Sequence, residues 1–357
     1  MSISRFAPVI VLLVALSACS SPTSILAPAG TAANAAAALD SWHDVLAQQG
    51  LPAAGCFEST YPSINWERVK CATPPHLWFP VPPSRRKGGV QPNVGNGDDY
   101  TADTSPHRMS MAIGSFPVER GVTSVTSVGC CGSQGLNSYS LQLNSEFFPT
   151  SACGSLANCL GWEQFVYSNP PGTAQGVLFI QDWLVPTHGA FSKCPPSAGW
   201  QDVGFGCVQN SAYGAYIPNV AVTDLKKVIE TGVAASSGDS VYLAVGNHEY
   251  GMENVQSDGI TDLAKHWKGA EFNIVGNGGG DVANFAGESR IGINIQTDTG
   301  LQTAPKCPPN TGTTGETNNL VFVAAPKTVP PLKYPSIEFS MNYKSSSTPS
   351  CDRVAGT

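Results

Sequence analysis

Between about residue 95 and about residue 325 the chain consists of short runs in which apolar and polar residues alternate. Examples are SYSLQLN at 138–144, QFVYS at 164–168, VLFIQDWLV at 177–185, VYLAV at 241–245, EFNIV at 271–275 and RIGINIQ at 290–296. Gly, Asn, Asp, Pro and Ser separate these runs, and alternation with a period of two is typical of β-strands. The sequence therefore predicts an all-β fold: a large antiparallel β-sandwich of the jelly-roll kind with a few short helices.

Composition narrows the class of protein further. Only 13% of the 357 residues are charged, against about 25% in an average soluble protein, which argues against coiled coils and helical bundles. Hydrophobic residues make up 41% of the chain, more than a disordered chain carries. The formal net charge of −7 indicates no general basic surface, so we expect no nucleic-acid partner.

The N-terminal residues indicate export. The apolar run at 9–16 is too short to span a bilayer and is typical of a secretory signal peptide, here at 1–18. The motif LSAC at 16–19 also matches a bacterial lipobox, so we expect lipidation of Cys19 and membrane attachment through that lipid alone. Ordinary signal cleavage, with Cys19 removed or left free, is the alternative. Residues 19–37 would form a flexible tether, and the protein would be an envelope lipoprotein or secreted.

Cysteine usage also predicts an oxidising compartment. Eleven cysteines minus Cys19 leave ten, an even set that is typical of disulfides in exported proteins. Short loops favour Cys56–Cys71, Cys153–Cys159 and Cys194–Cys207, whereas Cys307–Cys351 would tie down the C-terminal tail and the adjacent Cys130 and Cys131 would pair with each other. No Cys-x-x-Cys pair supports a metal site instead.

Changes in composition divide the mature chain into three parts. Residues 38–93 form an N-terminal module and a candidate propeptide, and its basic island at 84–89 is either a cleavable linker or a plain surface loop. Residues 94–325 form the sandwich, and residues 326–357 form a C-terminal extension. Helical spacing is present at 36–49 and, more briefly, at 222–230 and 260–268. The last alternating run, at 337–343, is expected to add an edge strand.

Alternation also predicts which side chains share a face. Leu141 and Leu143 belong in the core, so Gln142 and Asn144 point to the opposite side. The same reasoning puts Glu271 and Asn273 outward, and Gln181 and Trp183 together on one face. Such a face is either a groove for an extended peptide or sugar or a solvated outer surface. As an outward residue, Glu271 is expected to tolerate substitution.

Three segments resemble the eqolisin, or glutamic peptidase, family. SLQLNSEFF at 140–148 with GWEQFVYS at 161–168 is similar to the segment around the family's catalytic glutamine, and GAEFNIVGNGGGDVANFAG at 269–287 resembles the segment with its catalytic glutamate. IGSFPVE at 113–119 resembles the run that opens the family's sandwich. The resemblance implies a concanavalin-like sandwich with Gln142 and Glu271 as the catalytic pair. Phe272 stands where the family has tryptophan.

The implied chemistry is hydrolysis of peptide bonds at acid pH. An ionised Glu271 would activate water, and the uncharged Gln142 would donate to the oxyanion. Asn144, Gln181, Trp183 and Asn273 would bind the substrate, a protein or peptide, while Glu146 and Glu163 are the nearest competing carboxyls. We expect no metal, no cofactor and a monomer. The alternatives are a carbohydrate- or peptide-binding sandwich without catalysis and a structural protein of the cell envelope.

Overall fold

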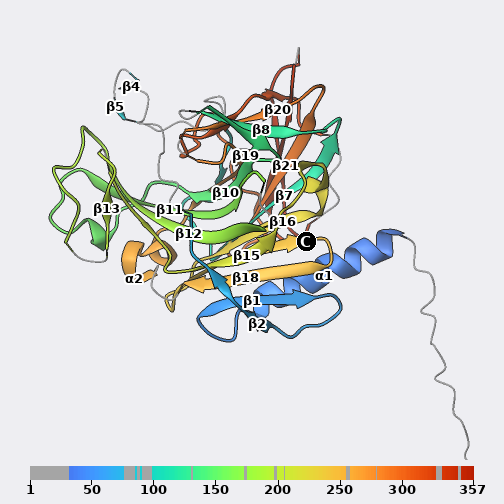
Figure 1. The fold of residues 1–357 in the computed structure, drawn as a ribbon, viewed down its shortest axis with the longest axis horizontal. Coiled ribbons are helices and arrows are strands. Elements are labelled where there is room, and N and C mark those ends of the chain that lie inside the picture. The colour runs from blue at the N-terminus through green and yellow to red at the C-terminus, as the bar shows by residue number, and fades with distance from the viewer. Residues whose placement is uncertain are drawn as a thin grey trace, which may run out of the picture. The chain divides into compact units, whose positions relative to one another are not determined.

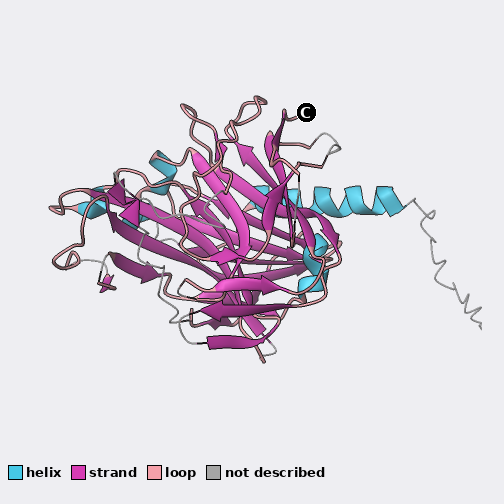
Figure 2. Ribbon diagram, turned by 90° about the horizontal axis from the view of Figure 1, so that it is seen from above, coloured by secondary structure: helices cyan, strands magenta, loops and turns pink. Residues whose placement is uncertain are grey.

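The computed structural model describes residues 32–75, 85–86, 89–90, 99–129, 132–172, 175–196, 199–204, 206–254, 258–278, 280–326, 332–344 and 347–357. The chain divides into two compact units, Met1–Ala38 and Leu39–Thr357. In the first unit, the described residues belong to the start of helix α1 (Ala32–Gln49). The second unit contains all the strands of the described chain and is mostly β (Figure 2).

The larger of the two main sheets has ten strands among the described residues. Its neighbours follow the order β2 (Glu67–Val69), β1 (Gly55–Thr60), β18 (His248–Asn254), β17 (Asp239–Val245), β16 (Val228–Val233), β7 (Met111–Arg120), β21 (Arg290–Asp298), β24 (Ser336–Asn342) and β23 (Val321–Val323), and β25 (Cys351–Val354) also pairs with β24. All of these pairings are antiparallel.

The second main sheet has nine strands and carries most of the predicted site residues. Its order is β13 (Gln201–Asp202), β14 (Cys207–Asn210), β12 (Gln175–Pro186), β11 (Cys159–Asn169), β10 (Tyr139–Ser145), β19 (Gly269–Val275) and β6 (Ala102–Asp103), while β15 (Gly214–Pro218) pairs with β12 and with β3 (Cys71–Ala72). Figure 1 shows β10, β11 and β12 side by side.

Smaller elements complete the described chain. A four-stranded sheet has the order β22 (Thr317–Asn318), β20 (Val282–Phe285), β8 (Val125–Gly129) and β9 (Gly132–Leu136), and β4 (Arg85–Arg86) pairs with β5 (Gly89–Val90). The short helical elements are α2 (Asp258–Thr261) and the 3₁₀ turns η1 (Ser151–Cys153), η2 (Val222–Lys227) and η3 (Leu263–Lys265). None of the described helices combines the length and the apolar character needed to cross a bilayer.

The two main sheets pack face to face around one hydrophobic core. Leu141 and Leu143 of the nine-stranded sheet belong to the same buried cluster as Ile293 of the ten-stranded sheet. Glycines let the sheets approach closely, because a Cβ atom at Gly114 would lie 2.2 Å from the Phe272 ring. A Cβ atom at Gly232 would likewise lie 2.5 Å from the Phe165 ring. The predicted antiparallel sandwich is therefore confirmed.

Most elements predicted from alternation are confirmed, with two corrections. All six alternating runs are strands, and 36–49 lies within α1. The segment 222–230 is a short 3₁₀ turn that continues into β16, and 260–268 contains only the end of α2 and η3. The expected edge strand at 337–343 is wrong, because β24 lies between β21 on one side and β23 and β25 on the other.

Four predicted disulfides are confirmed: Cys56–Cys71, Cys153–Cys159, Cys194–Cys207 and Cys307–Cys351. Such a set is typical of proteins outside the cytoplasm. Cys130 and Cys131, the signal peptide with Cys19, and residues 84, 87 and 88 of the basic island lie outside the described residues. Removal of 38–93 stays a prediction; in the structure, β1 from that module pairs along its whole length with β18.

Candidate functional site

Strand register brings the two predicted catalytic residues to one face of the nine-stranded sheet. On β10 and β19, Gln142 lies opposite Asn273, and Asn144 lies opposite Glu271. Gln142 and Glu271 are therefore diagonal neighbours on adjacent strands, two residues out of register. In antiparallel pairs such diagonal neighbours lie about 7–8 Å apart. On β11 and β12, Gln164 lies directly opposite Gln181 on the same side of the sheet.

The face of the sheet that carries Gln142 and Glu271, which we call the polar face, is buried. The interpretation of this face as a solvated outer surface is therefore wrong. Gln142 is 5% exposed and Glu271 is 1% exposed. The other four predicted site residues, Asn144, Gln181, Trp183 and Asn273, are also buried. The expectation that Glu271 tolerates substitution as an outward residue is therefore wrong. Residues 307–318, which we call the cover segment, lie against this face through Thr313 and Glu316.

Amide groups connect the predicted residues across the strands. Gln164 Nε2 donates to Gln142 Oε1 and to Asn144 Oδ1, both at 3.0 Å. Trp183 Nε1 donates to Gln164 Oε1 at 2.8 Å and to Gln181 Oε1 at 2.9 Å. Because Gln142 Oε1 accepts the hydrogen bond from Gln164, Gln142 Nε2 lies on the side of the amide group away from Gln164. There it contacts Ser140 Oγ at 3.4 Å and the carboxyl of Glu316.

Glu271 has one occupied and one unpartnered carboxyl oxygen. Its Oε2 accepts from the backbone N–H of Thr313 at 2.7 Å and from the Thr313 hydroxyl at 3.0 Å. Among the described residues, Glu271 Oε1 and Asn144 Nδ2 are buried without a hydrogen-bond partner of good geometry. The Asn144 side chain still lies close enough to lower the pKa of Glu271. Asn144 Nδ2 and Glu271 Oε1 thus lie opposite each other on adjacent strands, a donor facing an acceptor.

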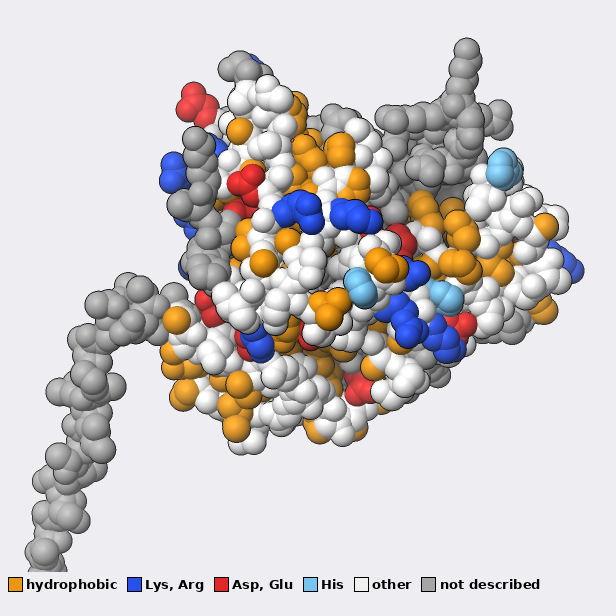
Figure 3. Space-filling view, turned by 180° about the vertical axis from the view of Figure 1, so that it is seen from behind, with side chains coloured by type: hydrophobic (Ala, Val, Ile, Leu, Met, Phe, Trp, Pro, Cys, Tyr) orange, Lys and Arg blue, Asp and Glu red, His pale blue; other side chains and the backbone are white. Residues whose placement is uncertain are grey.

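Burial dominates the electrostatics of Glu271. It raises the pKa of the carboxyl well above its usual value, and the Asp99 carboxyl raises it further. Asp99 is itself buried, and Asn273 Nδ2 donates to both of its oxygens at 3.0 Å. None of the described groups that shift the pKa of Glu271 is a cation. Lys and Arg side chains gather instead on the surface, as Figure 3 shows.

Two carboxyls of the polar face, Asp99 and Glu316, were not among the predicted site residues. Glu316 is 7% exposed, and burial raises its pKa while hydrogen bonds from Thr314 and Gln142 oppose that rise. Both residues lie in loop sequence without alternation, so no periodic signal marks them. Glu316, Gln142, Ser140, Ser168, Gln181 and Asn277 line a cavity of about 30 Å³, room for about one water molecule.

The competing carboxyls have other contacts. Glu146 accepts the backbone N–H groups of Lys268 and Gly269 at 2.7 Å, which fixes the start of β19, and burial raises its pKa to about 7. Glu163 points to the opposite side of the sheet and lies beside Asp182. Among the described residues, no group of three or more His, Cys, Asp or Glu side chains is arranged to hold a metal ion.

Comparisons with known protein families, with curated proteins and with solved structures found no match to this chain. The structure itself shows a mostly-β, two-sheet antiparallel sandwich with a buried polar face.

Proposed function

We propose that the chain is a peptide-bond hydrolase of the glutamic type that acts outside the cytoplasm, either secreted or anchored through Cys19. The supporting observation is that Gln142 and Glu271 share one buried face of a single sheet on adjacent strands. Their diagonal separation, about 7–8 Å for such neighbours, is one that an attacking water and a peptide carbonyl can bridge.

In this proposal Glu271 is the general base. Its ionised carboxylate takes a proton from water, the water oxygen bonds to the carbonyl carbon, and the carbonyl oxygen becomes an oxyanion. The amide N–H of Gln142 donates to that oxyanion without adding charge, and the proton then passes to the leaving amine as the C–N bond breaks. Asn144, directly opposite Glu271 and close enough to lower the pKa of its carboxyl, positions this base.

The remaining predicted residues have separate roles. Trp183 donates to Gln164, which in turn orients the Gln142 amide, and Trp183 also donates to Gln181. Asn273 holds Asp99 beside Glu271. We keep Asn144, Gln181, Trp183 and Asn273 as proposed substrate contacts, since all four lie on the polar face.

The raised pKa of Glu271 sets the pH range of the reaction. A base must be ionised, so activity rises as pH increases through that pKa, which lies above 4.5. We therefore expect little activity in strongly acid solution and a rise in activity as the pH increases.

The test is hydrolysis of fluorescently labelled casein by the whole chain between about pH 3 and about pH 7, with the cover segment intact or cut. Glu271→Gln keeps the shape of the side chain but removes the base, so it should abolish hydrolysis. The exposed Glu288 provides a matched control, and Glu288→Gln should retain full activity. If neither form of the wild-type protein hydrolyses casein, the proposal is wrong, and casein binding without hydrolysis would favour a binding protein.

A further inference from the structure

The cover segment contacts both proposed catalytic residues. Thr313 lies over Glu271, and its backbone N–H and hydroxyl both donate to the same carboxyl oxygen. The Thr313 hydroxyl oxygen also accepts from Trp162 Nε1 at 3.0 Å. A backbone N–H of the chain itself is thus bonded to the proposed base.

Three residues after Thr313, Glu316 lies beside Gln142, the second proposed catalytic residue. Its carboxyl lies beside the Gln142 amide, with which it lines the same small cavity, and this amide is the group that the reaction assigns to the oxyanion. Thr314 also donates to this carboxyl and holds it in place. The segment therefore presents a negatively polarised oxygen to Gln142 and a donor to Glu271, the two features that a reacting peptide would present.

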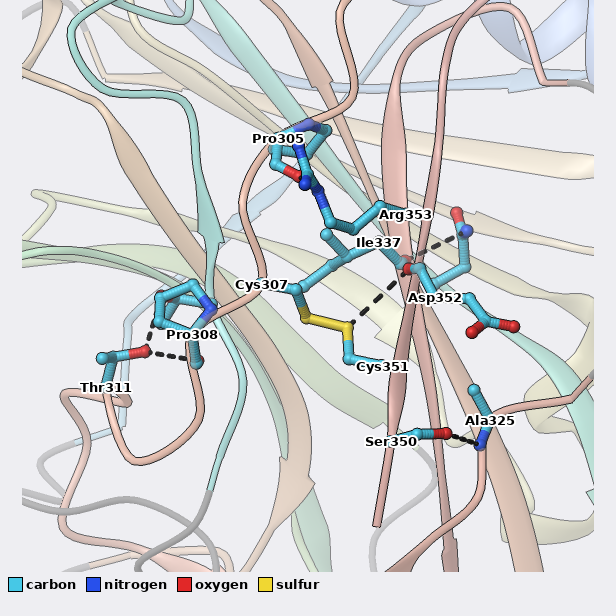
Figure 4. The surroundings of a disulfide bond; sticks show 12 residues. Pro305, Cys307, Pro308, Thr311, Ala325, Ile337, Ser350, Cys351, Asp352 and Arg353 are labelled. Atoms are coloured by element: carbon cyan, nitrogen blue, oxygen red, sulfur yellow. Dashed lines mark hydrogen bonds between the residues drawn. A yellow bond between two sulfur atoms is a disulfide. The ribbon is translucent and has the colours of Figure 1, made fainter.

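A disulfide and a strand pairing anchor the two ends of the cover segment, whereas hydrogen bonds hold its middle: the Thr311 N–H donates to the Asp99 carbonyl at 3.1 Å, and the Thr311 and Thr101 hydroxyls are 2.7 Å apart. At one end Cys307 is joined to Cys351, and Arg353 donates to Pro305 and Ala304 carbonyls (Figure 4). At the other end β22 pairs with β20. Residues 307–316 make no strand pairing, and Asn310–Glu316 contain no apolar side chain. Hydrogen bonds hold this part, each contributing about 0.5–1.5 kcal/mol, so it can open locally.

We propose that the cover segment is a built-in inhibitor that occupies the site as an extended peptide would and must move aside before substrate binds. This inference rests on the proposed function and adds its regulation. It also assigns the substrate class: an unfolded polypeptide, because residues 311–316, which fill the site, form neither helix nor strand.

The test is to cut the segment in the folded protein. A recognition sequence for a sequence-specific protease is inserted between Pro309 and Asn310, which are both exposed. The matched control carries the same insertion between Gly287 and Glu288, in an exposed turn before β21. After cutting and removal of the protease, labelling of Glu271 by a carbodiimide and an amine is measured by mass spectrometry, and casein hydrolysis is measured in parallel.

Cutting at Pro309 should raise Glu271 labelling and hydrolysis by about tenfold or more, the effect of losing one or two of these hydrogen bonds. The control cut should change neither, and the exposed Glu288 provides an internal reference for labelling. Glu316→Gln keeps the shape of the side chain, and in the uncut protein it should also raise hydrolysis. Equal labelling and equal hydrolysis before and after cutting would overturn the inference. Increased labelling without any hydrolysis would support the cover and reject the peptidase.

Discussion

The two faces of the nine-stranded sheet bury carboxyl groups in different surroundings. On the face toward the ten-stranded sheet, Glu163 and Asp182 lie directly opposite each other and are completely buried. Burial raises the pKa of Glu163, and Asp239 and Asp182 raise it further. Thr261 donates to Glu163 at 2.7 Å and to Asp182 at 3.1 Å. We call Glu163, Asp182 and Asp239 the inner acidic cluster.

The polar face differs in what covers its carboxyls. Glu271 lies opposite Asn144 and under Thr313 of the cover segment, and Glu316 of that segment lines a small cavity with Gln142. The inner acidic cluster instead lies between strands of two sheets and helix α2, where the core excludes water. Similar chemical groups are thus enclosed by packed strands and helix α2 on one face and by a segment without apolar side chains at 310–316 on the other.

The largest expected effect is on catalysis by the polar face. With the cover segment cut, Gln142→Ala should lower kcat/KM by about 10²–10³, the usual loss for one oxyanion donor. Gln296→Ala, at a half-buried position on β21 of the other sheet, is the matched control and should leave kcat/KM unchanged. Steady-state hydrolysis of labelled casein measures both variants, and an equal loss in the two would contradict the assignment of Gln142.

The second effect is a loss of stability as pH rises. Groups whose pKa is higher in the folded than in the unfolded chain stabilise the fold fully below the unfolded value, and this contribution disappears as pH rises through the folded value. Glu146, with its pKa raised to about 7, should alone remove about 3 kcal/mol, at 1.36 kcal/mol per unit. Urea unfolding at pH 4 and pH 8 should show the lower free energy at pH 8; a value independent of pH would refute this.

A single substitution in the inner acidic cluster should reverse part of that loss. Glu163→Gln removes one buried ionisable group and keeps its shape, so the free energy of unfolding at pH 8 should rise by about 1–3 kcal/mol. Casein hydrolysis should not change, in contrast to Glu271→Gln. The effect is measured by urea unfolding of Glu163→Gln, with Glu288→Gln unfolded in parallel as the control. If Glu163→Gln were less stable than the wild type at pH 8, the charge of Glu163 would be needed for stability.

The smallest effect concerns the indole that supports the amide network. Trp183→Phe removes the donor to Gln164 and Gln181 but keeps most of the buried aromatic surface. We expect a loss of about 1 kcal/mol in stability and a few-fold lower kcat/KM, since Gln164 then orients Gln142 less firmly. Thermal unfolding and casein hydrolysis of this variant test the prediction, and a loss in kcat/KM as large as that of Gln142→Ala would contradict it.

The sequence pattern predicts the strands and their faces because alternation follows directly from strand geometry. Leu141 and Leu143 point into the core as expected, and Gln142 points away. Short loops likewise predict disulfides, since the cysteines that close them are near in space. The position of β24 was not predictable in the same way, because pairing partners far apart in sequence leave no local signal.

The cover of the polar face could not be predicted from the sequence. Alternation tells which side chains share a face but not what lies over that face. Asn310–Glu316 has the composition of an ordinary surface loop, yet Thr313 and Glu316 are buried against Glu271 and Gln142. Asp99, too, belongs to the site only through tertiary contacts, namely its hydrogen bonds from Asn273.

The most direct test of Glu271 as the base is the pH dependence of kcat/KM for casein, before and after the cover segment is cut. This parameter reports the pKa of groups in the free enzyme. In the intact chain, activity should rise with a midpoint above 4.5, because Glu271 is buried beside Asp99. Cutting should move that midpoint toward lower pH, since water then reaches the carboxyl. A midpoint that does not move on cutting, or a Glu271→Gln protein with the same profile as the wild type, would contradict the assignment.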